Sequence, residues 1–345
     1  MGSMRILALH PRDWAGWAGK DLHGVDVRHV SIGGYVPRRL TGEATWDGIG
    51  DVVDQNSISL LYSTTKDFEP DAFLFGIHLG FERWHLERFR EISPKTFVAM
   101  HYTDQRDGVP KEVAKYEGLL DVLLLNNDDS DDHDKYRKVG FRTATFYDGF
   151  SPFDYWPRPA GTTCDVFFGG NNHAGLQREI VEMGKEPIES LNFPRSEFRE
   201  NLLVQIGRYF DLIVRGRFGW RGTPLRVKPM LFHPRFNDAM REAKIVLGTS
   251  VYPKHKLYMR RLFRSVASGR MTIMEKMPGM EEDFENGRHF SWFETVDDCL
   301  DLIRYYLDHD EEREKVARQG RRHFVENHTF KNRLVEFVEI VRSRS

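Results

Sequence analysis

Short apolar runs alternate with segments of helical character along most of the chain, and this alternation constrains the fold more than any other feature. The runs in the first half lie at 4–10, 72–77, 96–100, 122–125 and 143–146. Apolar runs of this length, separated by helical segments such as 82–92 and 131–139, are typical of buried strands in a parallel sheet. The sequence therefore predicts an α/β fold with helical crossovers.

The pattern is interrupted once and then restarts. Residues 151–163 contain three prolines and predict a linker. Further runs follow at 164–168, 212–214, 245–247 and 271–274, and the tail from 296 to 342 has helical character. The length of 345 residues suits two domains. We predict two tandem Rossmann-like, doubly wound domains, 1–155 and 156–328, facing each other across a cleft. A helix over 329–345 is expected to pack back on the first domain.

Composition limits the class of protein. Apolar residues make up 40% of the chain and charged residues 30%, which is typical of a packed globular protein. The net charge of -2 argues against a general attraction to nucleic acid. The two cysteines, Cys164 and Cys299, lack the spacing of a metal site or a redox pair. The sequence has no apolar run of membrane-spanning length, so we expect a cytoplasmic protein without a membrane span.

Basic and Gly-rich loops follow three predicted strands of the second half. Parallel sheets bind ligands beyond the carboxyl ends of their strands, so these loops are where a site is expected. The loop 169–172, Gly-Gly-Asn-Asn, presents backbone amides before a helix, although a plain tight turn is the alternative. The segment 215–220 carries Arg215 and Arg217.

The segment 254–264 places two lysines and three arginines at the front of a predicted helix. Cations at a helix N-terminus oppose its dipole unless an anion lies between them. The three segments together predict a phosphate or diphosphate site, and a solvated basic face is the alternative for the third. Glu281 and Glu282 follow the turn Pro278-Gly279, where they either stabilise the next helix or accept hydrogen bonds from sugar or ribose hydroxyls.

The stretch from Ile245 to about Leu334 carries a resemblance to a known family. It includes Arg260-Arg-Leu-Phe-Arg-Ser-Val-Ala-Ser-Gly269, Pro278-Gly-Met-Glu-Glu282 and Ala317-Arg-Gln-Gly320. It resembles the C-terminal, donor-binding half of the group-1 glycosyltransferases, in particular the branch typified by spore-maturation CgeB-like proteins. The resemblance implies the two-domain GT-B fold and a hexosyl- or pentosyltransferase. It further implies that the donor is a nucleotide-diphosphate sugar, with a UDP-sugar as the first candidate. An enzyme of this kind requires neither a metal nor a further cofactor.

Residue by residue, the resemblance assigns Gly169, Gly170 and Asn171 to the diphosphate, together with Arg260 or Arg261. It assigns Glu281 and Glu282 to the donor sugar, and we add Arg217 and Lys256 as anion-binding candidates from the basic loops. One position departs from the family. Arg264 stands where the family has a glutamate that binds the ribose hydroxyls, so the resemblance leaves the nucleotide unidentified.

Candidate catalytic residues follow two strands of the first half. His101 and Asp104 follow the run 96–100, and His101 resembles the histidine that contacts the donor sugar in retaining GT-B enzymes. A histidine that merely caps its loop is the alternative. His10 and Asp13 follow the first strand and are further candidates for a base or for acceptor binding. A carboxylate base, Asp13 or Asp104, would favour inversion at the anomeric centre.

The acidic run 126–134 allows two interpretations. Oxygen-rich clusters bind divalent ions. Asp and Ser before a predicted helix also cap its N-terminus and complement its dipole, which is the interpretation that we favour.

The acceptor stays open at this stage. A glycan, a protein, a small molecule and a hydroxymethylated base of phage-type DNA are the alternatives, and Arg38-Arg39 with the nearby Tyr35 and His29 gives faint support for DNA. A sugar-nucleotide-binding protein without catalysis is the alternative function.

Overall fold

The computed structural model describes residues 3–10, 22–31, 53–76, 80–104, 106–152, 161–231 and 235–343. Two units divide the chain. Unit 1 comprises Met1–Tyr147 and Phe330–Ser345, and unit 2 comprises Asp148–Thr329. The boundaries expected from the sequence, after residues 155 and 328, differ from these by eight residues and one residue.

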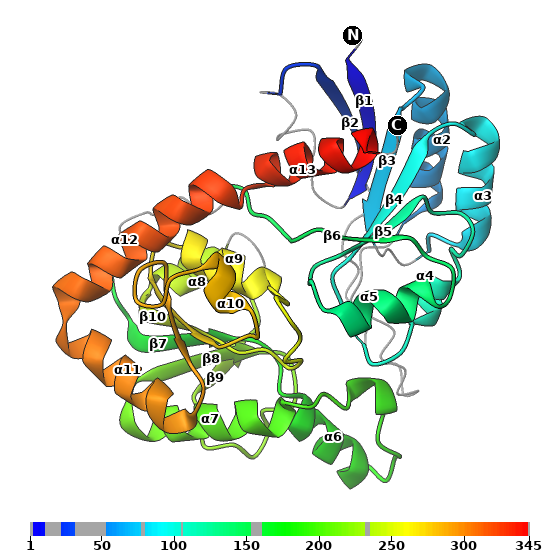
Figure 1. Ribbon diagram of the computed structural model, residues 1–345. Helices are drawn as coiled ribbons and strands as arrows, with labels where there is room; N and C mark the ends of the chain where they lie inside the picture. The colour runs from blue at the N-terminus through cyan, green and yellow to red at the C-terminus, as the bar shows by residue number, and fades with distance from the viewer. Residues whose placement is uncertain are drawn as a thin grey trace. The chain divides into compact units, whose positions relative to one another are not determined.

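Unit 1 contains a six-stranded parallel sheet with the strand order β2-β1-β3-β4-β5-β6 (Figure 1). Its strands are β1 (Met4–His10), β2 (Val25–Ser31), β3 (Ala72–Gly76), β4 (Phe97–Tyr102), β5 (Val122–Leu125) and β6 (Thr143–Thr145). Its helices are α2 (Gln55–Phe68), α3 (Arg83–Ile92), α4 (Lys111–Ala114), α5 (Ser130–Arg137) and α13 (Phe330–Arg342). The register pairs Gly76 with His101 and Tyr102 with Leu125, so these strand ends lie at one edge.

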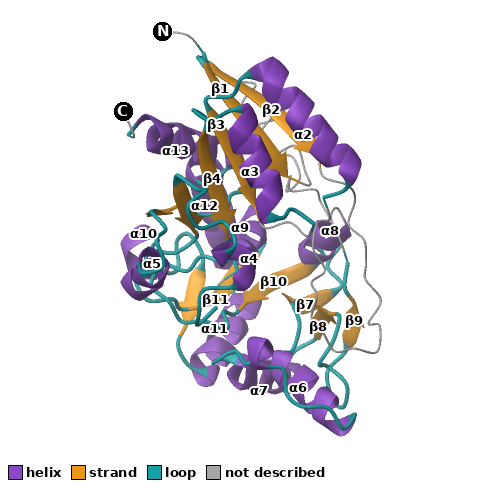
Figure 2. Cartoon of the chain, turned by 90° about the vertical axis from the view of Figure 1, so that its right-hand side faces the viewer, coloured by secondary structure: helices purple, strands orange, loops and turns teal. Residues whose placement is uncertain are grey.

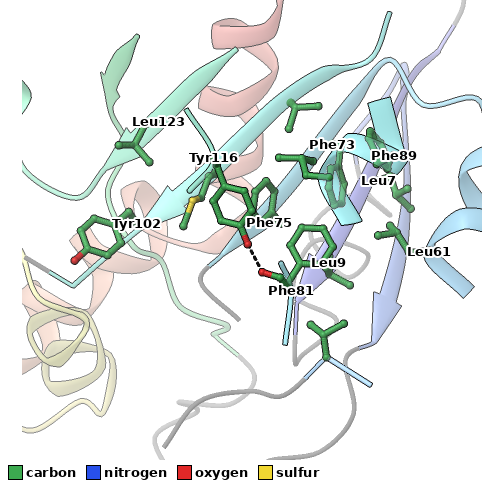
Figure 3. Close-up of a cluster of buried hydrophobic side chains, with 14 of the residues drawn as sticks. Leu7, Leu9, Leu61, Phe73, Phe75, Phe81, Phe89, Tyr102, Tyr116 and Leu123 are labelled. Atoms are coloured by element: carbon green, nitrogen blue, oxygen red, sulfur yellow. Dashed lines mark hydrogen bonds between the residues drawn. The ribbon is translucent and has the colours of Figure 1, made fainter. Parts of the chain in front are cut away.

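Alternate residues of the unit 1 strands build two cores. On one face, Phe73 and Phe75 of β3 pack with Leu61 of α2 and Phe89 of α3 (Figure 3). The hydroxyl of Tyr116 in this core donates a hydrogen bond to the carbonyl oxygen of Phe81. On the other face, the intervening strand residues pack against α13 through Leu334, Phe337, Val338 and Val341. Figures 1 and 2 show α2 and α3 on one side of this sheet and α13 on the other.

The apolar face of α13 is expected to contribute to the stability of unit 1. Phe337 is fully buried, whereas Val335 on the same helix is 39% exposed. Replacing Phe337 with Ala removes buried ring surface and leaves a cavity, so we expect a loss of about 3–5 kcal/mol in the free energy of unfolding, measured by urea denaturation. The matched control Val335→Ala is expected to change it by about 0.5 kcal/mol. Equal losses would contradict the packing of α13 on this sheet.

Unit 2 repeats the architecture with a second six-stranded parallel sheet, in the order β12-β11-β10-β7-β8-β9. Its strands are β7 (Cys164–Gly169), β8 (Leu212–Gly216), β9 (Val227–Pro229), β10 (Ala243–Gly248), β11 (Met271–Glu275) and β12 (Ser291–Phe293). Its helices are α6 (His173–Glu182), the short 3-10 helix η1 (Glu189–Leu191), α7 (Ser196–Tyr209), α8 (Arg235–Arg241), α9 (Arg260–Ala267), α10 (Met280–Asp283), α11 (Val296–Asp308) and α12 (Asp310–Asn327).

Helices cover both faces of the unit 2 sheet. On one face, Leu202 and Ile206 of α7 and Ile303 of α11 pack against Val166 and Ile245. Helices α8 and α9 lie on the opposite face from α7, as Figures 1 and 2 show. The predicted α/β fold with two parallel sheets is therefore confirmed. Within the described ranges, no helix is long and apolar enough to cross a membrane.

Two stacked imidazoles in unit 2 make its stability depend on pH. The rings of His289 and His323 have centroids 3.9 Å apart and planes inclined by 12°. Burial lowers the pKa of both, and together with the charge of His323 it brings the pKa of His289 to about 4 from an ordinary value of 6.5.

Between pH 4 and pH 6.5 the unfolded chain binds more protons than the folded one, because His289 is protonated more readily when unfolded. The free energy of unfolding is therefore expected to be highest above pH 6.5 and to fall as the pH is lowered toward 4. Urea denaturation across this range is expected to show a shallower fall for His323→Gln than for the natural chain. An unchanged slope in the variant would exclude the stacked pair as its origin.

Candidate functional site

The strand order of unit 2 reverses between β7 and β10. In open parallel sheets, ligands bind outside the carboxyl ends of the strands at such a reversal, because the following loops diverge to opposite faces there. In unit 2 the loops in question begin at Gly170 after β7 and at Thr249 after β10. The α7 helix ends just before β8 begins, so its N-terminus, at Ser196, also lies toward this edge.

The loop after β7 packs closely against the loop after β8. The indole Nε1 of Trp220 donates to the carbonyl oxygen of Gly170 at 3.1 Å. The Nδ2 of Asn172 donates to the carbonyl oxygen of Gly219 at 2.6 Å, and the same side chain caps α6. A Cβ on Gly219 would overlap the carbonyl oxygen of Asn172, so the two backbones touch. These contacts fix the shape of the loop 169–172.

Backbone amides of the Gly-Gly-Asn-Asn loop are used within the protein. The N–H of Gly170 donates to the carbonyl oxygen of Arg215 at 2.9 Å, and the N–H of Asn172 donates to that of Phe218 at 3.2 Å. Gly170 also leaves space for a side chain from another element. A Cβ there would lie 2.8 Å from the Nη2 of Arg261. The second glycine therefore makes room for a guanidinium group, which supplies the positive charge beside this loop.

Arg199 and Arg261 converge beside this loop from two helices. The Nη1 of Arg261 donates to the carbonyl oxygen of Thr249 at 2.8 Å. The Nε of Arg199 donates to the Oγ1 of Thr249 at 2.7 Å, and its Nη1 donates to the carbonyl oxygen of Asn171 at 3.2 Å. Both guanidinium groups lie over the ring of Phe168. The Cζ of Arg199 is 5.8 Å from the ring centroid, and the Cζ of Arg261 is 5.1 Å from it.

Arg199 is buried and Arg261 is half-buried, and this loss of hydration strengthens their attraction for an anion. Burial lowers the pKa of Arg199 to about 9, with a further contribution from the charge of Arg261. Burial lowers the pKa of Arg261 to about 10. Both stay protonated at neutral pH. Two adjacent cations of this kind are stabilised by a shared anion, and the fork geometry of arginine suits phosphate oxygens.

One buried carboxylate accompanies these arginines. Glu275, at the end of β11, is 3% exposed. It accepts hydrogen bonds from the Nε of Arg195 at 2.7 Å and from the backbone N–H of Ser250 at 3.1 Å. Burial raises the pKa of Glu275, and the neighbouring Arg195 opposes the rise. Arg195 binds this carboxylate directly, and the charge of Arg199 also favours its ionised form.

The neighbouring residues Arg260 and Arg261 have different partners. The Nε of Arg260 forms an ion pair with the buried carboxylate of Asp148, the first residue of unit 2. The same carboxylate accepts the backbone N–H of Gly149 at 2.9 Å. The sequence offered either arginine as the diphosphate ligand. In the structure Arg261 donates to Thr249 after β10, and its Nη2 lies close to Gly170 after β7.

Lys256 and Glu282, two of the predicted ligand-binding residues, pair with each other. The Nζ of Lys256 lies 2.9 Å from Glu282 and 3.0 Å from Asp283, and the hydroxyl of Tyr258 donates to Asp283 at 2.7 Å. The hydrogen bond to Glu282 raises the pKa of Lys256, and Lys256 in turn lowers the pKa of Glu282. This ion-pair network joins the loop before α9 to α10. Lys256 also has a left-handed backbone, with φ of 48°.

The remaining predicted residues of unit 2 belong to β7, to the loop after β8, and to α9 and α10. The backbone N–H of Arg217 donates to the Oδ1 of Asn171 at 2.9 Å. Arg264 is on α9, one turn beyond Arg260, and Glu281 is exposed on α10. Gly169 ends β7, where a Cβ would meet the ring of Phe236.

The predicted catalytic residues belong to unit 1. His101 is the penultimate residue of β4, and its ring lies edge-on to that of Phe146 with centroids 5.0 Å apart. Asp104 forms an ion pair with Arg106 at 2.7 Å. The surrounding protein raises the pKa of the Asp104 carboxyl, while the charge of Arg106 opposes this. His10 ends β1, but its side chain and all of Asp13 lie outside the described residues.

The acidic segment 126–134 caps a helix. The carboxylate of Asp129 accepts the backbone N–H of Asp132 at 3.1 Å at the start of α5, and Asp132 forms an ion pair with Lys135 at 2.9 Å. Helix capping is therefore the interpretation that the contacts support. In the part of the chain that the structure describes, no three His, Cys, Asp or Glu side chains are grouped to hold a metal ion.

Sequence reasoning missed Arg195, Arg199, Thr249 and Glu275. A signal for Arg199 was present, because it occupies the same helical stripe as Leu202, Leu203 and Ile206. An arginine on the apolar stripe of an amphipathic helix must find partners inside the protein, which makes it a candidate for a site. Glu275 carries a weaker signal of the same kind, since it ends the apolar run of β11.

Comparisons with known proteins bear on the fold and on the class of protein. A family model described as glycosyl transferase-like matches residues 195–339, a segment that includes Arg195, Arg199, Arg261 and Glu275. No curated protein sequence matches the chain.

Solved structures are similar over nearly the full length. A glycosyltransferase from Rickettsia africae has 11% identity and a TM-score of 0.60, with 99% of each chain covered. Alr3699/HepE of Anabaena, in complex with UDP and glucose, has 13% identity and a TM-score of 0.57, with 99% of this chain and all (100%) of that chain covered. Sucrose-phosphate synthase from Thermosynechococcus elongatus has 9% identity and a TM-score of 0.58, covering 99% and 98%. The fold of this protein is therefore the GT-B fold of glycosyltransferases.

The close approach of the loops after β7 and β8 is testable with two glycines of similar conformation. Gly219 and Gly222 have φ of 78° and 76°, but a Cβ on Gly222 meets nothing within 4 Å among the described residues. Gly222→Ala is expected to cost about 1–2 kcal/mol through left-handed backbone strain alone. Gly219→Ala is expected to cost about 2 kcal/mol more because of the overlap with Asn172. Urea denaturation measures both, and equal costs would mean that the two backbones do not touch.

Proposed function

We propose that this protein is a glycosyltransferase that transfers a sugar from a nucleotide-diphosphate sugar, UDP-sugar first, to an acceptor hydroxyl. The observation that carries the proposal is the pair Arg199 and Arg261 at the strand reversal of unit 2. Their guanidinium groups both bind Thr249 and carry poorly hydrated positive charge beside the loop 169–172. The fold and the match of residues 195–339 to a glycosyl transferase-like family model support it. So does the UDP bound by Alr3699/HepE.

In this proposal the diphosphate lies against Arg261 and Arg199, beside Gly169, Gly170 and Asn171. Negative charge grows on the diphosphate as the bond to the sugar breaks. Guanidinium groups that are already oriented stabilise that charge without reorganisation, which lowers the barrier for transfer. Arg217 and Arg264 are proposed to add positive charge at the edge of the site, and Glu281 to bind donor hydroxyls.

Lys256 and Glu282 enter the proposal in a changed form. The charges of Lys256 and Glu282 neutralise each other, so we propose that this pair holds the loop before α9 against α10. The pair would then influence donor binding through the shape of that loop.

Unit 1 is proposed to bind the acceptor. His101, Asp104, His10 and Asp13 stay predictions for the catalytic groups. A glycan, a protein, a small molecule and a hydroxymethylated DNA base remain the proposed acceptors. The CgeB-like branch, transfer without a metal, hexosyl or pentosyl transfer and a cytoplasmic location belong to the same proposal.

The adjacent arginines of α9 allow a matched test. Arg261→Gln removes a charge-assisted contact to the diphosphate, so we expect UDP to bind about 10–100-fold more weakly by isothermal titration calorimetry. Arg260→Gln removes an arginine that pairs with Asp148. It is expected to lower stability and to leave the affinity for UDP within about threefold. Circular dichroism confirms that both variants are folded at the temperature used.

The outcomes separate the proposal from its alternatives. Equal weakening by the two substitutions would remove Arg261 from its assigned role. A natural chain that binds no UDP at millimolar concentration would refute the UDP donor. Incubation with a panel of nucleotide sugars, with and without saccharide acceptors, then distinguishes an enzyme, which releases free nucleoside diphosphate, from a protein that only binds.

A further inference from the structure

Thr249 and Ser250, directly after β10, connect the two arginines to the rest of unit 2. The carbonyl oxygen of Thr249 accepts from Arg261 at 2.8 Å, and its Oγ1 accepts from Arg199 at 2.7 Å. Both residues of the segment are buried, at 1% and 3% exposed. The orientation of both guanidinium groups therefore depends on where this short segment lies.

The carboxylate of Glu275 anchors this segment. One carboxylate oxygen accepts the backbone N–H of Ser250 at 3.1 Å, while the other accepts from Arg195 at 2.7 Å. Glu275 ends the neighbouring strand β11, so the contact ties the segment after β10 to the adjacent strand of the sheet. The side chain of Arg195 lies over the ring of Phe198, 3.9 Å from its centroid, which limits the freedom of this partner.

We infer that Glu275 is a positioning residue of the nucleotide site, acting through Ser250 and Thr249 on Arg261 and Arg199. The inference rests on the proposed function and adds to it a residue that touches no ligand. By holding the Ser250 N–H, the carboxylate fixes the two oxygen atoms of Thr249 that orient the guanidinium groups. The diphosphate then meets arginines whose hydrogen-bond directions are set before it binds.

Electrostatics alone predicts the opposite effect of removing this residue. A buried negative charge near an anion site weakens anion binding, so a neutral residue at position 275 would strengthen it. The positioning role instead requires an acceptor for the Ser250 N–H, whatever its charge. Two neutral side chains of similar size separate these effects. Glutamine retains an oxygen that can accept the N–H, and leucine does not.

The experiment measures the affinity for UDP of the Glu275→Gln and Glu275→Leu variants by isothermal titration calorimetry. Both substitutions remove the same charge. Glu275→Leu is expected to bind UDP about tenfold more weakly than Glu275→Gln, because the Ser250 N–H loses its acceptor and the Thr249 segment shifts. Lys276→Gln is the matched control, since it removes the ion pair of Lys276 with Glu294 and leaves the Ser250 N–H its acceptor. It is expected to bind UDP like the natural chain.

A second arm tests whether the effect passes through Arg261. In an Arg261→Gln background, the difference in UDP affinity between Glu275→Gln and Glu275→Leu is expected to shrink to about threefold, since one of the two oriented guanidinium groups is absent. A general loss of packing would leave the gap unchanged. If Glu275→Leu does not fold, as judged by circular dichroism, the more adaptable Glu275→Met takes its place.

The results distinguish the failure of this inference from that of the proposed function. Equal affinities of the Gln and Leu variants, or an undiminished gap in the Arg261→Gln background, would overturn the positioning role while the natural chain still binds UDP. If the natural chain binds no UDP, the proposed function fails, and this inference fails with it.

Discussion

The hydrogen bonds from two arginines to one threonine, at the place where the strand order of unit 2 reverses, are the interactions on which the candidate site depends. Arg199 comes from α7 and Arg261 from α9, two helices that follow different strands. Guanidinium groups repel each other, and burial removes the water that would screen them. The fold holds both because Thr249 accepts from each and because Glu275 lies nearby with an opposite charge. An anion would complete this charge balance.

The glycines beside these arginines allow close approach of the surrounding loops and side chains. The Gly-Gly-Asn-Asn loop has the composition of an amide-based phosphate cradle, yet the N–H groups of Gly170 and Asn172 donate within the protein. Gly170 instead leaves room for the guanidinium group of Arg261, and Gly219 lets the loop after β8 touch the backbone of Asn172. The positive charge beside this loop therefore comes from side chains of other elements, which the loop sequence itself does not reveal.

Much of the fold was predictable because interior strands of a parallel sheet are buried on both faces and appear as continuous apolar runs. Strands β1, β3, β4, β5, β7, β8, β10 and β11 were recognised in this way, and the run 143–146 also predicted the edge strand β6. The strands that escaped, β2, β9 and β12, all lie at sheet edges. In β2, Val25 and Val27 alternate with more exposed polar residues, and β9 and β12 are three residues long, so a search for continuous apolar runs passes over them.

The sequence by itself determined the two parallel sheets and the edge of unit 2 at which basic residues gather, because buried strands and their alternation with helices follow from local patterns. It could not distinguish Arg260 from Arg261, since two adjacent arginines of a helix differ only in the direction in which their side chains project. The tertiary structure decided that Arg260 meets Asp148, 112 positions earlier, and that Arg261 meets Thr249. It also decided that Arg195 and Glu275, 80 positions apart, form a pair. Partners so distant in sequence are set by packing, which no local pattern encodes.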